Sequence, residues 1–351
     1  MSCRPANPPR MPGFQANCTF LASRRAARRT SWVQATAAAE GTKRGRCPGC
    51  SAVRNVSWLS APDRFHARDR TYHLVRCLSC SLVWLEDAPL PSEMGQHHGA
   101  DYDRVISGPG ADPKHWAARR DTLLRYNSGG RVLDLGCSSG GFSASLKAPA
   151  WQVFGIEMSE PLARQAEAAC GARVFVGDVL NAPFSPASFD AITCFHVLEH
   201  LYEPKKALAK VSEWLKPGGI FYAMMPNIDS AGARIFKSYW YALELPRNLF
   251  HFSPASLRYV AGSVGLEEVS VTTHREVFIE RSVRYIIDDF LRKMGISRPS
   301  LAKAKDVSIP WKAVRKGYRW TILPILTGLA SLAGDGESIY AIFRKGPGGK
   351  A

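Results

Sequence analysis

Residues 131–142, Arg-Val-Leu-Asp-Leu-Gly-Cys-Ser-Ser-Gly-Gly-Phe, constrain the fold of this chain more than any other stretch. The apolar run predicts a short buried strand with Asp134 near its carboxyl end, and Gly136, Gly140 and Gly141 predict a tight turn into a helix. Backbone N–H groups converge at such a turn, and glycine lets a ligand approach closely. The pattern therefore predicts a site for a nucleotide-like ligand in an open α/β sheet.

The turn is not the fingerprint of a dinucleotide-binding protein. That fingerprint is Gly-x-Gly-x-x-Gly, and its second glycine lets the backbone approach a pyrophosphate; here Ser138 occupies that position. An acid before the turn, with a second acid further along the chain, suits a ligand with a nucleoside and an amino group but no phosphate.

The same arrangement of a strand with a polar end repeats downstream. Glu157 lies 23 residues after Asp134, close to the offset of about 20 at which an acid meets a ribose in nucleotide-binding folds. We expect the further strands at 153–156, 173–176, 189–195 and 220–225, with a helix that ends at Leu215 before the last of them.

Five segments in order, VLDLGCSSGGF, GIEMSE, GDV, FDAITCFHVLEHL and LKPGGIFYAMMPN, resemble the motifs of class I S-adenosylmethionine-dependent methyltransferases. The resemblance covers about residues 129–275. It is greatest to the subgroup with an HVLEH signature, which includes ubiquinone-pathway O-methyltransferases and bacterial small-molecule methyltransferases. It implies an α/β fold: a Rossmann-like, seven-stranded sheet with an antiparallel last strand and helices on both faces.

The resemblance also implies S-adenosyl-L-methionine as the cofactor. Asp134 and the glycine turn would hold its methionine part, Glu157 its ribose hydroxyls and Asp178 its adenine amino group, since a carboxylate only accepts hydrogen bonds. The alternative is that Asp134 merely caps a helix and Glu157 is a surface acid. The candidate cofactor-binding residues are Asp134, Gly136, Ser138, Gly140, Glu157, Met158, Asp178, Val179 and Phe195.

Four residues are candidates for the chemistry at the methyl acceptor. His196, Glu199 and His200 are spaced i, i+3 and i+4, so a helix would place them on one face, where they either act on the acceptor or brace the helix. Related quinone methyltransferases have an acid at the position of His196, which argues against a metal there. His251 is the preferred base or acceptor-binding residue; the alternative is a loop histidine bonded to the backbone.

Four of the nine cysteines form two Cys-x-x-Cys pairs, Cys47 with Cys50 and Cys77 with Cys80. This spacing predicts a tetrahedral structural Zn²⁺ site in a zinc ribbon over residues 46–100, because each turn directs two sulfurs at one point. All four ligand positions would be filled, which leaves none for a catalytic water. Disulfides or a redox pair are the alternatives. The pattern also resembles the zinc ribbon that precedes many methyltransferases with the HVLEH signature.

The net charge of +16 is unevenly distributed. Residues 1–46 hold nine Lys or Arg and one acid, so they supply half of it, and residues 1–45 are predicted to be a disordered basic tail. The remainder is only moderately basic, which argues against nucleic acid as a partner. The tail lacks an apolar signal segment, and we expect a cytoplasmic protein. It resembles an organelle transit peptide in composition, and a mis-assigned start codon explains it equally well.

Residues 101–128 are expected to form a linker and a helix, and 129–346 a methyltransferase domain with an insertion at 278–334. Strands at 266–272 and 338–343 should form its antiparallel edge. The apolar run within 310–332 is too short to span a bilayer. It is compatible with peripheral membrane contact, and equally with a lid or a homodimer surface.

Together these patterns predict methyl transfer to a small-molecule, sugar or lipid-linked acceptor. Two alternatives remain. One is an RNA methyltransferase, and the other is a non-catalytic binding protein that retains the fold.

Overall fold

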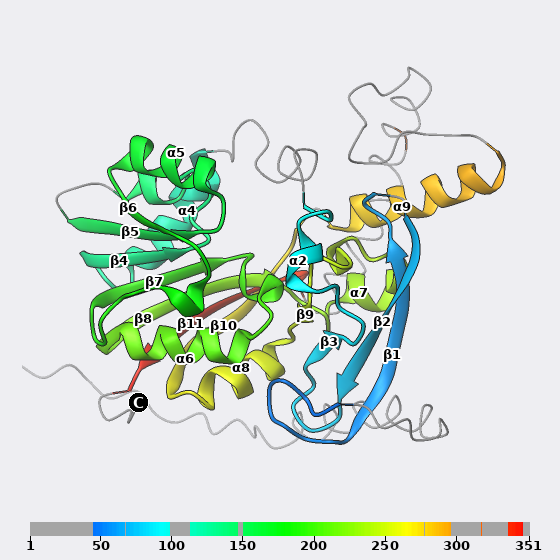
Figure 1. Ribbon diagram of the computed structural model, residues 1–351, viewed down its shortest axis with the longest axis horizontal. Coiled ribbons are helices and arrows are strands. Elements are labelled where there is room, and N and C mark those ends of the chain that lie inside the picture. Colours follow the sequence, from blue (N-terminus) through cyan, green and yellow to red (C-terminus); the bar gives the residue numbers. More distant parts are fainter. Residues whose placement is uncertain are drawn as a thin grey trace, which may run out of the picture. The chain divides into compact units, whose positions relative to one another are not determined.

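A computed structural model of the protein describes residues 45–66, 68–98, 113–146, 150–276, 278–295, 317 and 336–346. Its main feature is a seven-stranded sheet in the order β10-β11-β8-β7-β4-β5-β6 (Figure 1). Only β11 runs antiparallel to its neighbours. The strands are β4 (Gly130–Leu135), β5 (Trp151–Glu157), β6 (Arg173–Val176), β7 (Phe189–Phe195), β8 (Leu215–Pro226), β10 (Leu266–His274) and β11 (Ser338–Lys345).

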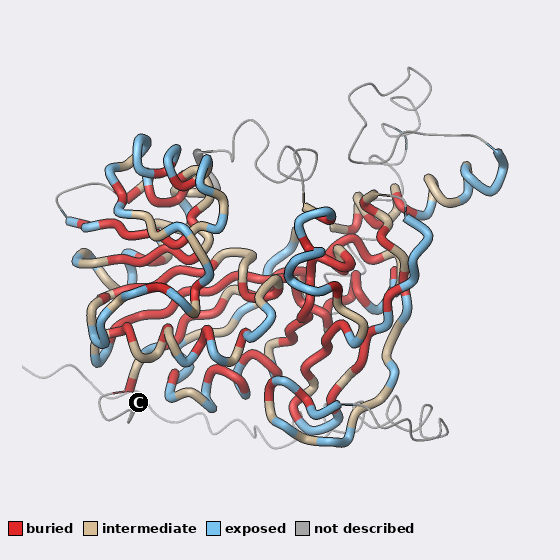
Figure 2. The backbone as a smooth tube through the Cα atoms, viewed as in Figure 1, coloured by how far each residue is buried: buried red, intermediate tan, exposed pale blue. Residues whose placement is uncertain are grey.

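The strands alternate between two apolar cores, one on each face of the sheet. Leu133 and Leu135 belong to one core and Val132 to the other, as the two-residue period of a strand requires. Helix α4 (Pro113–Leu124) contributes Leu123 to the second core. Helices α6 (Pro204–Trp214) and α8 (Pro254–Gly262) cover the first. In Figure 2 the buried strands run between more exposed helices, so the predicted fold class is confirmed.

The predicted strands agree closely with those observed, and Ser253 is the N-cap of α8, where it accepts a hydrogen bond from the Ser256 amide. The helix expected after the glycine turn is shorter than predicted. It is the single 3₁₀ turn η2 (Ser143–Ser145). The hydroxyl of Ser145 donates to the Phe142 carbonyl, a local bond of the kind through which serine disfavours helix propagation.

A second sheet, β1-β2-β3-β9, joins the two parts of the chain. Strands β1 (Asn55–Asp63), β2 (Arg68–Cys77) and β3 (Val83–Leu85) belong to residues 45–98, which we call the cysteine module. Strand β9 (Phe250–His251) comes from the segment after β8 and pairs antiparallel with β3. The cysteine module therefore shares backbone hydrogen bonds with the larger α/β part.

The remaining elements are short, apart from α9 and α5. They are α2 (Pro91–Met94), α5 (Glu160–Cys170), α7 (Ala231–Phe236), α9 (Phe278–Lys293), η3 (Val179–Asn181), η4 (Leu198–His200), η5 (Lys237–Tyr239) and η6 (Tyr241–Leu243). None of the helices in the described ranges is long and apolar enough to cross a membrane. The predictions for the tail before residue 45 and for 310–332 fall on residues outside the described ranges, residue 317 excepted.

Candidate active site

The order of the strands has its switch point between β4 and β7. Strand β4 pairs in parallel with β5 on one side and with β7 on the other, so the chain direction across the sheet reverses here. Ligands of open α/β sheets bind at this reversal, beyond the carboxyl ends of the strands. Asp134, Glu157, Asp178 and His196 all lie at or just after these carboxyl ends, so the sheet gathers four predicted site residues along one edge.

Asp134 is a buried carboxylate held by two hydroxyl groups. Its Oδ1 accepts a 2.7 Å hydrogen bond from Thr193 Oγ1, and its Oδ2 accepts a 3.1 Å bond from Ser143 Oγ. Burial raises the pKa of Asp134 to about 6, although both hydroxyl groups act in the opposite direction. The ionised carboxylate of Asp134 is shielded from solvent, so it favours a cationic ligand group, such as the ammonium of a methionine moiety.

Glu157 and Asp178 are both anchored by backbone amides. Glu157 accepts 2.9 Å bonds from the amides of Ser138 and Ser159, one on each oxygen, and Asp178 accepts a 2.7 Å bond from the amide of Leu180. A carboxylate oxygen has two acceptor positions, so Glu157 can still accept ribose hydroxyls. Of the other candidates, Val179 is buried and Met158 is exposed.

Two glycines of the turn have no room for a side chain. A Cβ on Gly136 would lie 2.3 Å from Cγ2 of Val197, and one on Gly140 would lie 2.8 Å from Cα of Ala166. Ser138, which replaces the fingerprint glycine, has φ +48°, a left-handed conformation that ordinarily favours glycine. The close approach of Gly136 and Val197 packs the segment after β7 directly against the turn after β4.

Residues 196–200, the HVLEH segment, form a histidine–carboxylate pair at this edge. His196 Nδ1 lies 3.3 Å from Glu199 Oε1, with the Glu199 side chain buried and that of His196 35% exposed. Burial raises the pKa of Glu199, but the bond from His196 and the charges of His196 and His200 outweigh it and leave the pKa below its usual value. Because a carboxylate only accepts, Nδ1 of His196 donates, and its Nε2 is the basic nitrogen.

The other two candidate histidines are bonded to backbone carbonyls. His200 Nδ1 lies 3.1 Å from the Arg247 carbonyl, and His251 Nε2 lies 3.1 Å from the Leu243 carbonyl. Burial lowers the pKa of His251 to about 4, so its ring is neutral at pH 7. The Leu249 amide, two residues before His251, donates to the Glu199 carbonyl at 2.8 Å, which brings β9 next to the HVLEH segment. All four candidate catalytic residues thus gather in one region, and their individual roles stay predictions.

Sequence reasoning missed the groups that hold Asp134 and those that line its surroundings. Thr193 gave a usable signal, because it is a polar residue inside the apolar strand FDAITCF. The guanidinium of Arg119 stacks 5.1 Å from the centre of the Phe195 ring, and its charge opposes the raised pKa of Asp134. The sequence did not indicate that Arg119 faces the site, because α4 has no clear apolar face from which its orientation could be predicted.

The four paired cysteines converge on one point. Their sulfurs all lie within 4.8 Å of one another, and the Sγ–Sγ separations are 3.5 Å for Cys47 with Cys80 and for Cys50 with Cys77. Tetrahedral zinc with sulfur ligands at about 2.3 Å separates the sulfurs by about 3.8 Å. The residues therefore fit a four-thiolate zinc ion. The structure assigns them no disulfide.

Known proteins match the part of the chain that holds the strand-end acids. Residues 111–271 match the family described as "Methyltransferase domain". The chain contains a class I methyltransferase domain. S-adenosyl-L-methionine is the cofactor of this domain family, and the strand-end carboxylates and the glycine turn found here fit it.

Relatives of this methyltransferase domain occur in several bacteria. A "Ubiquinone biosynthesis O-methyltransferase" of Azoarcus sp. (strain BH72) is 29% identical over 41% of this chain and 67% of its own length. An "Uncharacterized methyltransferase" of Geobacillus kaustophilus (strain HTA426) is 33% identical over 34% of this chain. Of that relative the match spans only 58%. A solved methyltransferase from Archaeoglobus fulgidus is 16% identical, over 70% of this chain and 98% of its own, with a TM-score of 0.47.

Proposed function

We propose that the protein transfers a methyl group from S-adenosyl-L-methionine to a hydroxyl group of a small-molecule, sugar or lipid-linked acceptor. The observation that carries this proposal is the His196–Glu199 pair at the carboxyl end of β7. A hydroxyl is a poor nucleophile until it loses its proton, so O-methylation gains from a positioned base more than transfer to an amine does.

The chain's own residues perform the binding and the proton transfer. Asp134 and Glu157 would hold the cofactor's methionine and ribose parts, and the bound cofactor would supply an electrophilic methyl on sulfur. Glu199 fixes the His196 ring with Nδ1 protonated, so Nε2 takes the proton of the acceptor hydroxyl, to whose oxygen the bound cofactor would supply the methyl group. The proton then passes from Nε2 to solvent. Besides this base, the protein contributes proximity and alignment.

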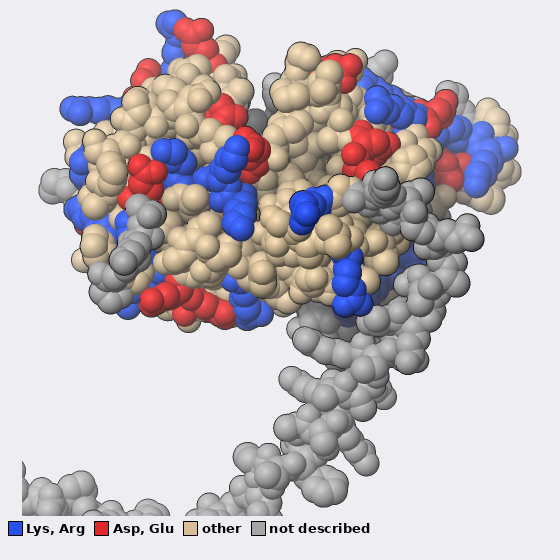
Figure 3. Space-filling model, turned by 60° about the horizontal axis from the view of Figure 1, so that its bottom comes forward, with Lys and Arg blue, Asp and Glu red and all other residues tan. Residues whose placement is uncertain are grey.

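The face of the molecule drawn in Figure 3 gives little support to RNA as the acceptor. On the face in Figure 3, Lys and Arg lie interspersed with Asp and Glu over the described residues, without a continuous basic stripe. Nucleic-acid binding depends mainly on such a stripe. The relatives that are named as ubiquinone O-methyltransferases favour a small acceptor instead.

The test incubates the protein and methyl-labelled cofactor with a metabolite extract and, in parallel, with total RNA. We expect label in an extract product whose mass spectrum shows an O-methyl group, and none in RNA. Label in RNA, or in an N-methyl or C-methyl product, would contradict the proposal. Calorimetric titration with the cofactor distinguishes an enzyme from a non-catalytic binding protein that retains the fold. A folded protein that gives no binding heat would be the non-catalytic protein.

A further inference from the structure

Hydrogen bonds connect the cysteine module to the HVLEH segment through Leu249, and to Tyr202 just after that segment. The Leu85 amide donates to the Leu249 carbonyl, and the Leu249 amide donates in turn to the Glu199 carbonyl, each at 2.8 Å. The hydroxyl of Tyr202 donates to the Pro89 carbonyl, also at 2.8 Å. One backbone residue, Leu249, thus connects the module directly to the partner of the proposed base.

The end of the module reaches the same region as a ring pair. The rings of His98 and His200 lie edge to face with centres 6.2 Å apart, and His98 is only partly buried. His200 donates its Nδ1 hydrogen to the Arg247 carbonyl, because a carbonyl only accepts, so in its neutral form Nε2 of His200 is an acceptor for hydroxyl groups. Burial and the charge of His200 lower the pKa of His98 to about 4, which keeps the His98 ring neutral.

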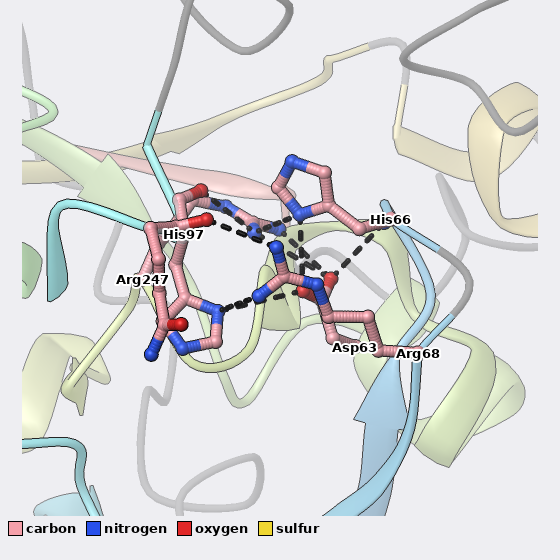
Figure 4. Close-up of polar contacts among 6 residues, drawn as sticks. Asp63, His66, Arg68, His97 and Arg247 are labelled. Atoms are coloured by element: carbon pink, nitrogen blue, oxygen red, sulfur yellow. Dashed lines mark hydrogen bonds and ion pairs between the residues drawn. The ribbon is translucent and has the colours of Figure 1, made fainter. Parts of the chain in front are cut away.

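A buried charged cluster fixes the chain next to His98 (Figure 4). Asp63, at the end of β1, is fully buried, and its Oδ1 lies 3.5 Å from both terminal nitrogens of Arg247. Arg247 also donates to the His97 carbonyl at 3.4 Å. Arg68 donates to the Gln96 carbonyl at 3.0 Å and contacts His97 Nδ1 at 2.9 Å.

These contacts hold the two residues before His98, Gln96 and His97, by their carbonyls, and so fix the position of the chain that leads to the His98 ring. We propose that the cysteine module completes the acceptor site: His98 and His200 bind a hydroxyl-bearing acceptor, and Asp63, Arg68 and Arg247 are positioning residues for His98. This inference rests on the proposed function, because the acceptor site is the place where the base of the HVLEH segment works. It assigns to the amino-terminal module a share in substrate recognition.

The test compares His98→Ala with His73→Ala, a substitution of an exposed histidine in the same module. The acceptor probe is a dilution series of the extract fraction that takes up label. Removing a neutral hydrogen-bonding group is expected to raise the apparent KM for this fraction about three- to tenfold, with kcat and the cofactor Kd unchanged. Equal kinetics for the two variants would overturn the inference.

A second pair of variants tests the positioning residues without breaking the buried Asp63–Arg247 pair. Arg68→Met is expected to raise the apparent KM for the extract fraction, as His98→Ala does. Arg68→Lys is expected to raise this KM less than Arg68→Met. A fall in kcat or in cofactor affinity with unchanged acceptor KM would overturn the positioning role. Failure of the proposed function looks different: the unsubstituted protein would bind the cofactor but label nothing, and the present inference would fall with it.

Discussion

Gly136 faces Val197 so closely that a Cβ on the glycine would lie 2.3 Å from Cγ2 of the valine. The contact joins the turn after β4 to the segment after β7 and so places the base of the HVLEH segment beside the cofactor turn. The spacing between the cofactor-holding residues and the base therefore depends on the absence of one methyl group.

Gly136→Ala is expected to lower both the free energy of unfolding and the affinity for the cofactor. Gly171→Ala is the matched control: its φ of +65° is close to the +67° of Gly136, but nothing lies within 4 Å of its Cβ position. Gly171→Ala should lower the free energy of unfolding only by the strain of a left-handed alanine, about 1–2 kcal/mol, and leave cofactor binding unchanged. Denaturant melts and calorimetry measure both quantities, and equal losses for the two variants would contradict the steric argument.

His196→Ala is expected to lower kcat about 10²- to 10⁴-fold and leave the cofactor Kd within about twofold, because a general base acts in the transition state. Glu199→Gln should lower kcat in the same direction, since the amide no longer selects the Nδ1–H form of the ring. Glu203→Gln changes an exposed acid a few residues away and serves as the control. A normal kcat in His196→Ala would exclude this base.

Affinity for the cofactor is expected to fall as the pH drops from 7 to 5. The pKa of Asp134 in the folded chain, about 6, exceeds its ordinary value of 3.8, so this carboxyl contributes stability below about pH 4 that is lost as the pH rises through 6. A cationic ligand favours the ionised carboxylate, so binding should strengthen over that same rise. Calorimetry between pH 5 and 8 measures this, and Asp134→Asn should remove the step; a step that survives the substitution belongs to another group.

Removal of zinc is expected to unfold the cysteine module. Structural zinc sites contribute about 10–16 kcal/mol in small peptides. Cys80→Ser should abolish bound zinc in elemental analysis and speed amide exchange in β3 and β9, which pair with each other. Cys170→Ser, outside the four-cysteine group, should retain one zinc ion per chain. Slow exchange in metal-free protein would show that the module does not depend on the ion.

Arg247→Met is expected to destabilise the fold by about 3–5 kcal/mol, because it removes the guanidinium beside the fully buried carboxylate of Asp63 and leaves it the contacts with His66 and His97. Arg258→Met breaks an ion pair with Glu268 at 2.7 Å, but both side chains are about 40% exposed, so its cost should stay below about 1 kcal/mol. Chemical denaturation of both variants gives the comparison. Similar costs would mean that Asp63 is protonated or solvated in the Arg247 variant.

Local patterns in the sequence predicted most of the sheet and its ligand-binding edge. Strand period, glycine positions and strand-end acids are encoded within a few neighbouring residues, and parallel strands necessarily bring their carboxyl ends to one edge. Asp134, Glu157 and Asp178 could therefore be placed together before any coordinates. The two Cys-x-x-Cys pairs could be matched for the same reason, because each turn carries its own geometry.

Only the tertiary structure decided which polar groups are buried and which distant segments pair. Asp63 and Arg247 are 184 residues apart and have no shared periodicity, so their contact follows from the docking of the cysteine module onto the methyltransferase domain. The same docking buries His251 in β9 against β3 and turns its Nε2 to a backbone carbonyl. A sequence records which side chains are polar, but burial and partner choice arise from packing between elements, which no local pattern specifies.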